Sequence, residues 1–203
     1  RLASNFGFYI GKTIGKNFRS KKSIIQNLKK SKIQIKISEN KFANNVLSNY
    51  GRILAEYPFL KDFRNDKLSR YIEIDGFENL QIIKKNNKPV VFISGHFSNF
   101  ELMAMQIEKS GINLAAIYRP LNNIFLNKTM EKIRINYICK NQIKKGRSGT
   151  RQILENLKKG NSIALMIDQR VTQGIKINFF GDMASTTTIP AQIIKKYKCD
   201  LVP

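Results

Sequence analysis

The fold is decided by the stretch PVVFISGHFSNFE, residues 89–101. Its first half is a continuous apolar run, which is typical of a central strand buried on both faces of a sheet. Gly95 and His96 end this run, and the polar residues after them lead into a predicted helix over 99–109. A strand, a turn and a helix in this order form the basic unit of an α/β sheet.

Strands and helices alternate around this stretch. Short apolar runs predict further strands over residues 71–74, 112–118, 162–167 and 175–180, with another beginning at 201. Amphipathic segments predict helices over residues 41–57, 77–85, 124–137, 150–159 and 191–198. The alternation predicts the α/β class, with a central mixed sheet flanked by helices.

The composition is strongly basic. The 203 residues include 36 Lys plus Arg and 14 Asp plus Glu, for a formal charge of +22. This charge predicts an anionic partner, such as nucleic acid, an anionic membrane surface or an acidic protein. The sequence has no zinc-finger, RNP or KH pattern, so no nucleic-acid partner is expected. It also lacks the GxxxxGK[ST] and GxGxxG phosphate loops, which argues against a nucleotide enzyme.

The cysteines predict a reducing environment. Cys139 and Cys199 have neither CxxC nor CxxH spacing, so the sequence indicates no disulfide framework and no zinc site. The chain begins at Arg1 rather than Met and ends where a strand is predicted to begin, so we expect an incomplete protein.

The N-terminal region has a composition of its own. Residues 12–41 carry ten basic residues and one acid, with aliphatic side chains between them. Such a basic amphipathic segment lies on a membrane surface, or is an ordinary helix with a solvated lysine face. We therefore expect a membrane-proximal segment over 1–40 and a main domain, C-terminally incomplete, over 41–203.

Polar residues follow three of the predicted strands. His96, Arg119 and Asp168 come directly after apolar runs, and sites in α/β sheets gather at the carboxyl ends of the strands. His96 is the only histidine, and a neutral imidazole can accept a proton from an attacking hydroxyl, although a structural role is the alternative. A guanidinium at the position of Arg119 binds phosphate or carboxylate, or pairs with a surface acid.

Glu101 has two interpretations. It can meet His96 if the histidine lies on the turn and Glu101 in the first helical turn, where its carboxylate would orient the imidazole. Alternatively, Ser98-x-x-Glu101 is a capping box with Ser98 as N-cap, and Phe97 and Leu102 occupy the hydrophobic-staple positions. The two roles are compatible, because a carboxylate has two oxygens.

Four sequence blocks together resemble the late acyltransferases of bacterial lipid A biosynthesis, the lauroyl/myristoyl transferase family. GHFSNFE resembles the family's HxxxxE signature, although Ser98 stands where glycine is usual and Phe100 where tryptophan is usual. AIYRPLNN, ALMIDQ, and NFFG followed by Ala-Ser-Thr resemble further family blocks in matching order across residues 91–186.

The resemblance implies a glycerolipid-acyltransferase-like α/β fold and acyl transfer from acyl carrier protein to a hydroxyl of an anionic, phosphorylated glycolipid. His96 would be the general base and Glu101 its orienting partner. Arg119 would bind an anionic part of the substrate, Asp168 would support the site, and backbone N–H groups near Asn99 would stabilise the oxyanion. No metal or bound cofactor is expected, and the cytoplasmic face of the bacterial inner membrane is the expected location.

The main alternative enzyme is a glycerol-phosphate-type acyltransferase, which uses an HxxxxD dyad. Glu101 and the YRP and DQ blocks count against it. A basic nucleic-acid-binding module is the alternative outside the enzymes.

Overall fold

Strand β1 (Val91–Ser94) forms as predicted and lies inside a five-stranded sheet. The structure is a computed structural model that describes residues 1–172 and 174–203, without the side chain of Arg147. β1 pairs with β4 (Ser162–Met166) on one side and with the short β7 (Leu201–Val202) on the other. Val91 is fully buried, as expected for a continuous apolar run in a central strand.

The sheet has the order β3-β2-β4-β1-β7, with β2 (Leu114–Tyr118) and β3 (Asn141–Lys144) completing it. The α/β class is therefore confirmed. Every pair in this sheet is parallel, so the expectation of a mixed sheet was wrong in that detail. Helices connect successive strands of the sheet, and such crossovers return the chain in the same direction.

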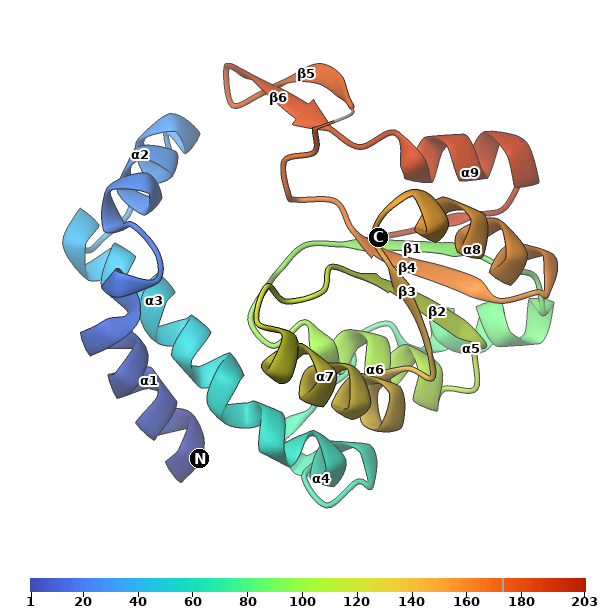
Figure 1. Cartoon of the computed structure of the whole chain (residues 1–203), viewed down its shortest axis with the longest axis horizontal. Coiled ribbons are helices and arrows are strands. Elements are labelled where there is room, and N and C mark those ends of the chain that lie inside the picture. Colours follow the sequence, from blue (N-terminus) through green and yellow to red (C-terminus); the bar gives the residue numbers. More distant parts are fainter. Residues whose placement is uncertain (173) are drawn as a thin grey trace. The chain divides into compact units, whose positions relative to one another are not determined.

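Helices cover both faces of the sheet (Figure 1). On one face, α8 (Arg147–Lys158) and α9 (Ile189–Tyr197) pack against the strands. The core on this face consists of the buried side chains of Val91, Ala115, Ile143, Ile153, Leu157, Ile163, Leu165 and Ile193. On the other face, α6 (Glu101–Lys109) packs against β2.

The described residues divide into two units. One contains Arg1–Phe59 and Ile175–Ser185, and the other contains Leu60–Gly174 and Thr186–Pro203. The first unit contains α1 (Leu2–Ile14), α2 (Lys21–Ser31), α3 (Glu39–Glu56), and a hairpin of β5 (Ile175–Phe179) and β6 (Asp182–Thr186), of which only Thr186 falls in the second unit. The remaining helices of the second unit are α4 (Leu60–Arg64), α5 (Phe77–Asn86) and α7 (Ile124–Ile133).

Glycines bring α1 and α3 into close contact. A Cβ on Gly51 would lie 2.0 Å from the carbonyl oxygen of Gly7, and a Cβ on Gly7 would lie 2.3 Å from that of Gly51. A side chain at either position would clash with backbone, so only glycine permits this approach. α1 therefore presents its small residues to α3 and its large apolar residues to the outside.

α2 carries part of the basic segment. Its Ile24 is buried in a small cluster with Ala43 and Leu47 of α3, while Lys22, Lys29 and Lys30 are exposed. This packing is what an ordinary amphipathic helix would show, and the expected membrane role of residues 1–40 stays a prediction. None of the helices among the described residues combines the length and the hydropathy that a membrane span requires.

Several predicted elements differ in detail. The strand predicted over 71–74 is absent from the described residues, where a 3-10 turn (Ser69–Tyr71) precedes non-regular backbone. Strands β3 and β6 were not predicted, because their polar residues hide the strand pattern. The helix predicted over 124–137 ends at Ile133 and continues as a π-helical turn, η4 (Arg134–Ile138).

Candidate active site

The turn between β1 and α6 carries His96. Gly95 is buried, and a Cβ there would lie 2.8 Å from the Phe97 ring and 3.3 Å from Oδ2 of Asp168. Ser98 has a φ of 43°, in the left-handed region that favours glycine. Ser98 is the residue that replaces the usual glycine in the resemblance described above, and its conformation explains why glycine suits the position.

The helix after the turn begins later than predicted. α6 starts at Glu101, Phe100 is its N-cap residue, and within the described residues no side chain caps this end. The capping box with Ser98 as N-cap was therefore wrong. A serine that caps a helix with its side chain takes an extended conformation, whereas Ser98 is left-handed.

Asp168 holds the His96 imidazole. Nδ1 of His96 lies 2.7 Å from Oδ1 of Asp168, and the His96 backbone N–H donates to Oδ2 over 2.7 Å. Nε2 of His96 lies 3.3 Å from Nε2 of Gln169. An Nδ1–H that donates to Asp168 and an Nε2 that accepts from Gln169 describe a neutral imidazole. The nitrogen that can take up a proton is then Nε2.

The pair remains partly accessible. The side chain of His96 is 27% exposed and that of Asp168 is 39% exposed. Desolvation raises the pKa of Asp168, but the hydrogen bonds from the His96 backbone and imidazole outweigh it and bring that pKa below its usual range. Phe100 packs edge-on against the imidazole, with ring centroids 4.8 Å apart. The ring is thus fixed on two sides.

Glu101 has a different partner. Its Oε1 accepts hydrogen bonds from Nε of Arg134 at 2.9 Å and from Nη2 at 2.6 Å. This ion pair is buried, with exposed side-chain fractions of 7% for Glu101 and 12% for Arg134. The role expected for Glu101 as the orienting partner of His96 stays a prediction, and Asp168 is the carboxylate that contacts the imidazole.

A polar network surrounds the end of β2. The Tyr118 hydroxyl donates to Glu131 at 2.5 Å, and Asn127 and Lys144 contact the same carboxylate at 2.9 and 3.0 Å. These hydrogen bonds lower the pKa of Glu131 to about 2. Burial and the hydrogen bond to Glu131 raise the pKa of the Tyr118 phenol. The network fixes the strand end that immediately precedes Arg119.

The other predicted site residues lie near these strand ends. Arg119 is exposed, and among the residues that the structure describes its guanidinium has no hydrogen-bond or ion-pair partner, so it is available to a ligand. Asn99 lies half-buried in the turn, where its carbonyl oxygen accepts from the backbone N–H of Leu102 at 3.1 Å. The strand order explains why Asp168 lies near His96. Asp168 follows β4, which lies between β1, the strand before His96, and β2, the strand before Arg119.

Large apolar side chains are exposed in the same loops. Phe97, next to His96, is 77% exposed, and Ile124, Phe125 and Leu126 at the start of α7 are exposed as well. An exposed apolar group beside a polar site suits a ligand with a long apolar part.

The sequence did not predict a role for Arg134. It lay inside a predicted helix, and nothing in the local pattern distinguished it from the other cations. Only the fold shows that it pairs with Glu101, 33 positions away in the chain. Gln169 had a visible signal, since it directly follows Asp168 at the strand end.

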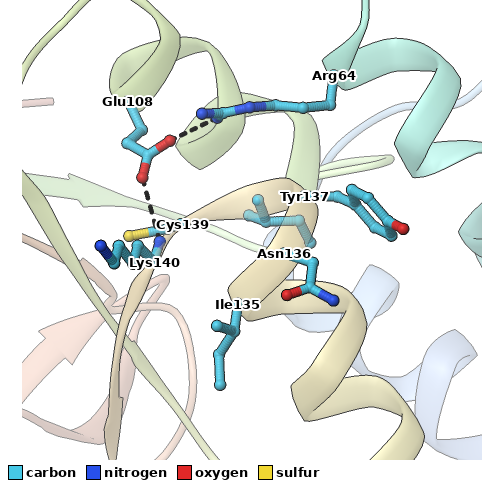
Figure 2. A pocket seen from close by; sticks show the side chains of 8 residues that line it. Arg64, Glu108, Ile135, Asn136, Tyr137, Cys139 and Lys140 are labelled. Carbon is cyan, nitrogen blue, oxygen red and sulfur yellow. Dashed lines mark hydrogen bonds and ion pairs between the residues drawn. The ribbon is translucent and has the colours of Figure 1, made fainter.

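A cavity of about 300 Å³ lies at the other end of α6 (Figure 2). The Glu108 carboxylate there pairs with Arg64 at 2.5 Å and accepts from the backbone N–H of Lys140 at 3.1 Å. No predicted site residue lines this cavity. Over the described residues, no group of three or more His, Cys, Asp or Glu side chains is arranged to hold a metal ion.

The partly exposed His96–Asp168 pair and the residues around it lie at the carboxyl edge of a parallel sheet. A search of curated proteins finds no match for this chain. The family model described as bacterial lipid A biosynthesis acyltransferase matches residues 1–203, and the chain therefore belongs to that family.

Proposed function

We propose that this lipid A acyltransferase moves a fatty acyl chain from acyl carrier protein to a hydroxyl of a lipid A precursor, with His96 as the general base. The observation that carries the proposal is the His96–Asp168 pair, because it assigns Nδ1 to the carboxylate and leaves Nε2 to accept a proton. Membership of the family supports the glycolipid substrate and the transferase chemistry.

The proposed reaction is a direct transfer. His96 Nε2 removes the proton of the acceptor hydroxyl, and the oxygen attacks the thioester carbonyl carbon to give a tetrahedral oxyanion. Backbone N–H groups of the turn near Asn99 supply donors for this oxyanion. The carbon–sulfur bond then breaks and the ester remains on the glycolipid. The thiolate of the carrier protein takes up the proton from the imidazolium.

Asp168 and Glu101 have separate tasks in this proposal. Asp168 orients the imidazole and stabilises its charged form during the reaction, as a carboxylate does in a catalytic triad. Glu101 is the first residue of the helix that follows the turn. As the glutamate of the HxxxxE pattern, it helps to orient His96. Arg119, exposed at the end of β2, binds an anionic group of the substrate.

We place residues 1–40 at the cytoplasmic face of the bacterial inner membrane. The outer side of α1 exposes Leu2, Phe6 and Tyr9, and basic residues follow from Lys12 onward. An apolar helix face next to cations is the arrangement of an interfacial helix on anionic lipid. Flotation with anionic and with zwitterionic vesicles tests this, and equal recovery with both would contradict the electrostatic part of the proposal.

The transfer itself is tested with the purified protein, acyl carrier protein loaded with a fatty acyl chain, and a lipid A precursor. Mass spectrometry should show a precursor that gains one acyl group, with the release of free carrier thiol. Acyl-coenzyme A in place of the carrier tests donor dependence and should give a much slower reaction. Arg64→Gln, at the remote ion pair, is the matched control and should keep its activity. No product with wild-type protein, or full activity in His96→Ala, would overturn the proposal.

The glycerol-phosphate-type acyltransferase and the nucleic-acid-binding module lose support from the family match over the whole chain. Glycerol 3-phosphate as acceptor is a direct test of the former, and we expect no transfer to it.

A further inference from the structure

We propose that Arg134 is a positioning residue for the acyl-transfer site: through Glu101 it fixes the start of α6, and with it the turn that presents His96. This inference rests on the proposed function, since it concerns the productive placement of the proposed general base.

The contact between Arg134 and Glu101 is close and buried. Two guanidinium nitrogens, Nε and Nη2, lie 2.9 and 2.6 Å from the same carboxylate oxygen. Both side chains are almost removed from solvent. Charge-assisted hydrogen bonds are short and strong, and burial protects this pair from screening by salt. The pair therefore fixes Glu101 more firmly than a surface ion pair would.

Glu101 transmits this constraint to His96 through the chain. It is the first residue of α6, and its neighbour Phe100 packs edge-on against the His96 imidazole. Asp168 contacts Nδ1 of the same ring. A shift of Glu101 would move Phe100 and change the packing on one side of the ring, while the Asp168 hydrogen bond would remain.

Arg134 also reaches the neighbouring strand end. Its guanidinium carbon lies 5.5 Å from the centroid of the Tyr118 ring, and Tyr118 directly precedes Arg119. The Tyr118 hydroxyl is held in turn by Glu131. Arg134 thus contacts both the residue that begins α6 and the strand that ends at the proposed anion-binding side chain. A single side chain couples the two loops.

The local structure of Arg134 is unusual. It is the first residue of the π-helical turn η4, immediately after α7 ends. π-Helical turns are rare and occur frequently at functional sites, because they redirect side chains that a regular helix would place elsewhere. Lysine could not replace the contact fully, since it has neither the planar fork nor the extended face over Tyr118.

The test is a double-mutant cycle in the acyl-transfer assay. Arg134→Gln should lower kcat by about 100-fold, since misplacement of a reacting group by about 1 Å costs this much. KM for the glycolipid should change far less, because the hydrogen bond to Glu131 still holds Tyr118 and the strand end before Arg119 in place. Arg134→Lys should recover part of kcat. In a protein that already carries Glu101→Gln, Arg134→Gln should lower kcat little further, because the two residues act through one contact.

The matched control is Arg64→Gln. Arg64 pairs with Glu108, which lies about 10 Å further along α6 at 1.5 Å per residue, so this substitution removes a similar ion pair away from the turn. Its kcat should remain close to that of the wild type. An equal loss of kcat in Arg64→Gln and Arg134→Gln would overturn the inference, because the loss would then reflect a general decrease in stability. Full additivity in the cycle would also overturn it.

A second measurement does not need activity. His96 is the only histidine, so its imidazole nitrogens give a single set of NMR signals. Arg134→Gln should shift and broaden these signals, and Arg64→Gln should leave them unchanged. A single cooperative thermal transition shows that each variant is folded. Unchanged signals in Arg134→Gln would contradict the positioning role. If His96→Ala retains full transfer, the proposed function fails, whereas the imidazole signals still decide whether Arg134 positions the ring.

Discussion

Two carboxylates near the β1–α6 turn form contrasting ion pairs. Asp168 meets His96 at the surface, where both side chains are partly exposed, and Glu101 meets Arg134 in the interior, where both are nearly buried. Partial exposure lets a substrate reach the imidazole, whereas burial removes Glu101 and Arg134 from such contact. The difference separates the pair that a substrate can reach from the pair that it cannot reach.

The two pairs should also differ in energy. A partly exposed pair contributes about 1 kcal/mol or less to stability, because water competes with it. Removing one partner of a buried pair costs about 3–5 kcal/mol, since it leaves a buried charge poorly compensated. Substitutions at the surface pair should thus reduce activity without unfolding the protein, and substitutions at the buried pair should affect both.

The largest effect is expected from His96→Ala. Loss of the general base should lower kcat by at least about 10²–10⁴-fold. The melting temperature should stay close to that of the wild type, because the imidazole is partly exposed. The measurement is acyl transfer followed by mass spectrometry, with thermal unfolding alongside. Turnover near the wild-type rate would remove His96 from the mechanism.

Asp168→Asn tests the orienting carboxylate. The amide cannot stabilise a charged imidazole, and it leaves the tautomer free to change, so kcat should fall by about 10²-fold or more. The free energy of unfolding should fall by no more than about 1 kcal/mol, a value discounted for the exposure of Asp168. The NMR signals of the single histidine should show a changed tautomer. An unchanged tautomer with unchanged kcat would mean that Asp168 has no role at the ring.

Glu101→Gln is expected to lower stability as well as kcat, and the loss of stability distinguishes it from the substitutions at the surface pair. Gln keeps the shape but loses the charge opposite the buried Arg134, so the free energy of unfolding should drop by about 3 kcal/mol. Glu108→Gln, at the less buried pair with Arg64, is the control and should lower the free energy of unfolding by less. Chemical denaturation measures both. A smaller loss at Glu101 than at Glu108 would reverse the ranking of the two pairs.

The smallest effect concerns pH. Because the folded protein holds the pKa of Asp168 below its unfolded value, the ionised form adds stability above the unfolded pKa near 4. This contribution should disappear as the pH falls below 4 toward the folded pKa. Glu131, with a pKa of about 2, acts in the same window. Denaturation between pH 6 and pH 2 should therefore show a shallower pH dependence in Asp168→Asn than in the wild type, or the assignment to Asp168 is wrong.

The sequence predicted the site at the level of strand ends. The apolar runs before His96, Arg119 and Asp168 were long enough to indicate strands, and parallel strands bring their carboxyl ends to one edge. The start of α6 was placed two residues too early, because Ser98 satisfied a capping pattern that its left-handed backbone does not permit. Local pattern alone could not reveal that conformation.

By itself, the sequence determined the α/β class, the three strand ends and the family blocks, since these depend on local periodicity and residue type. Only the tertiary structure decided which carboxylate contacts His96. Asp168 is 72 positions away from His96, and Arg134 is 33 positions away from Glu101. The placement of β4 beside β1 brings Asp168 to the imidazole, and the π-helical turn brings Arg134 to Glu101. Such pairings depend on strand order and helix packing, which no short stretch of sequence specifies.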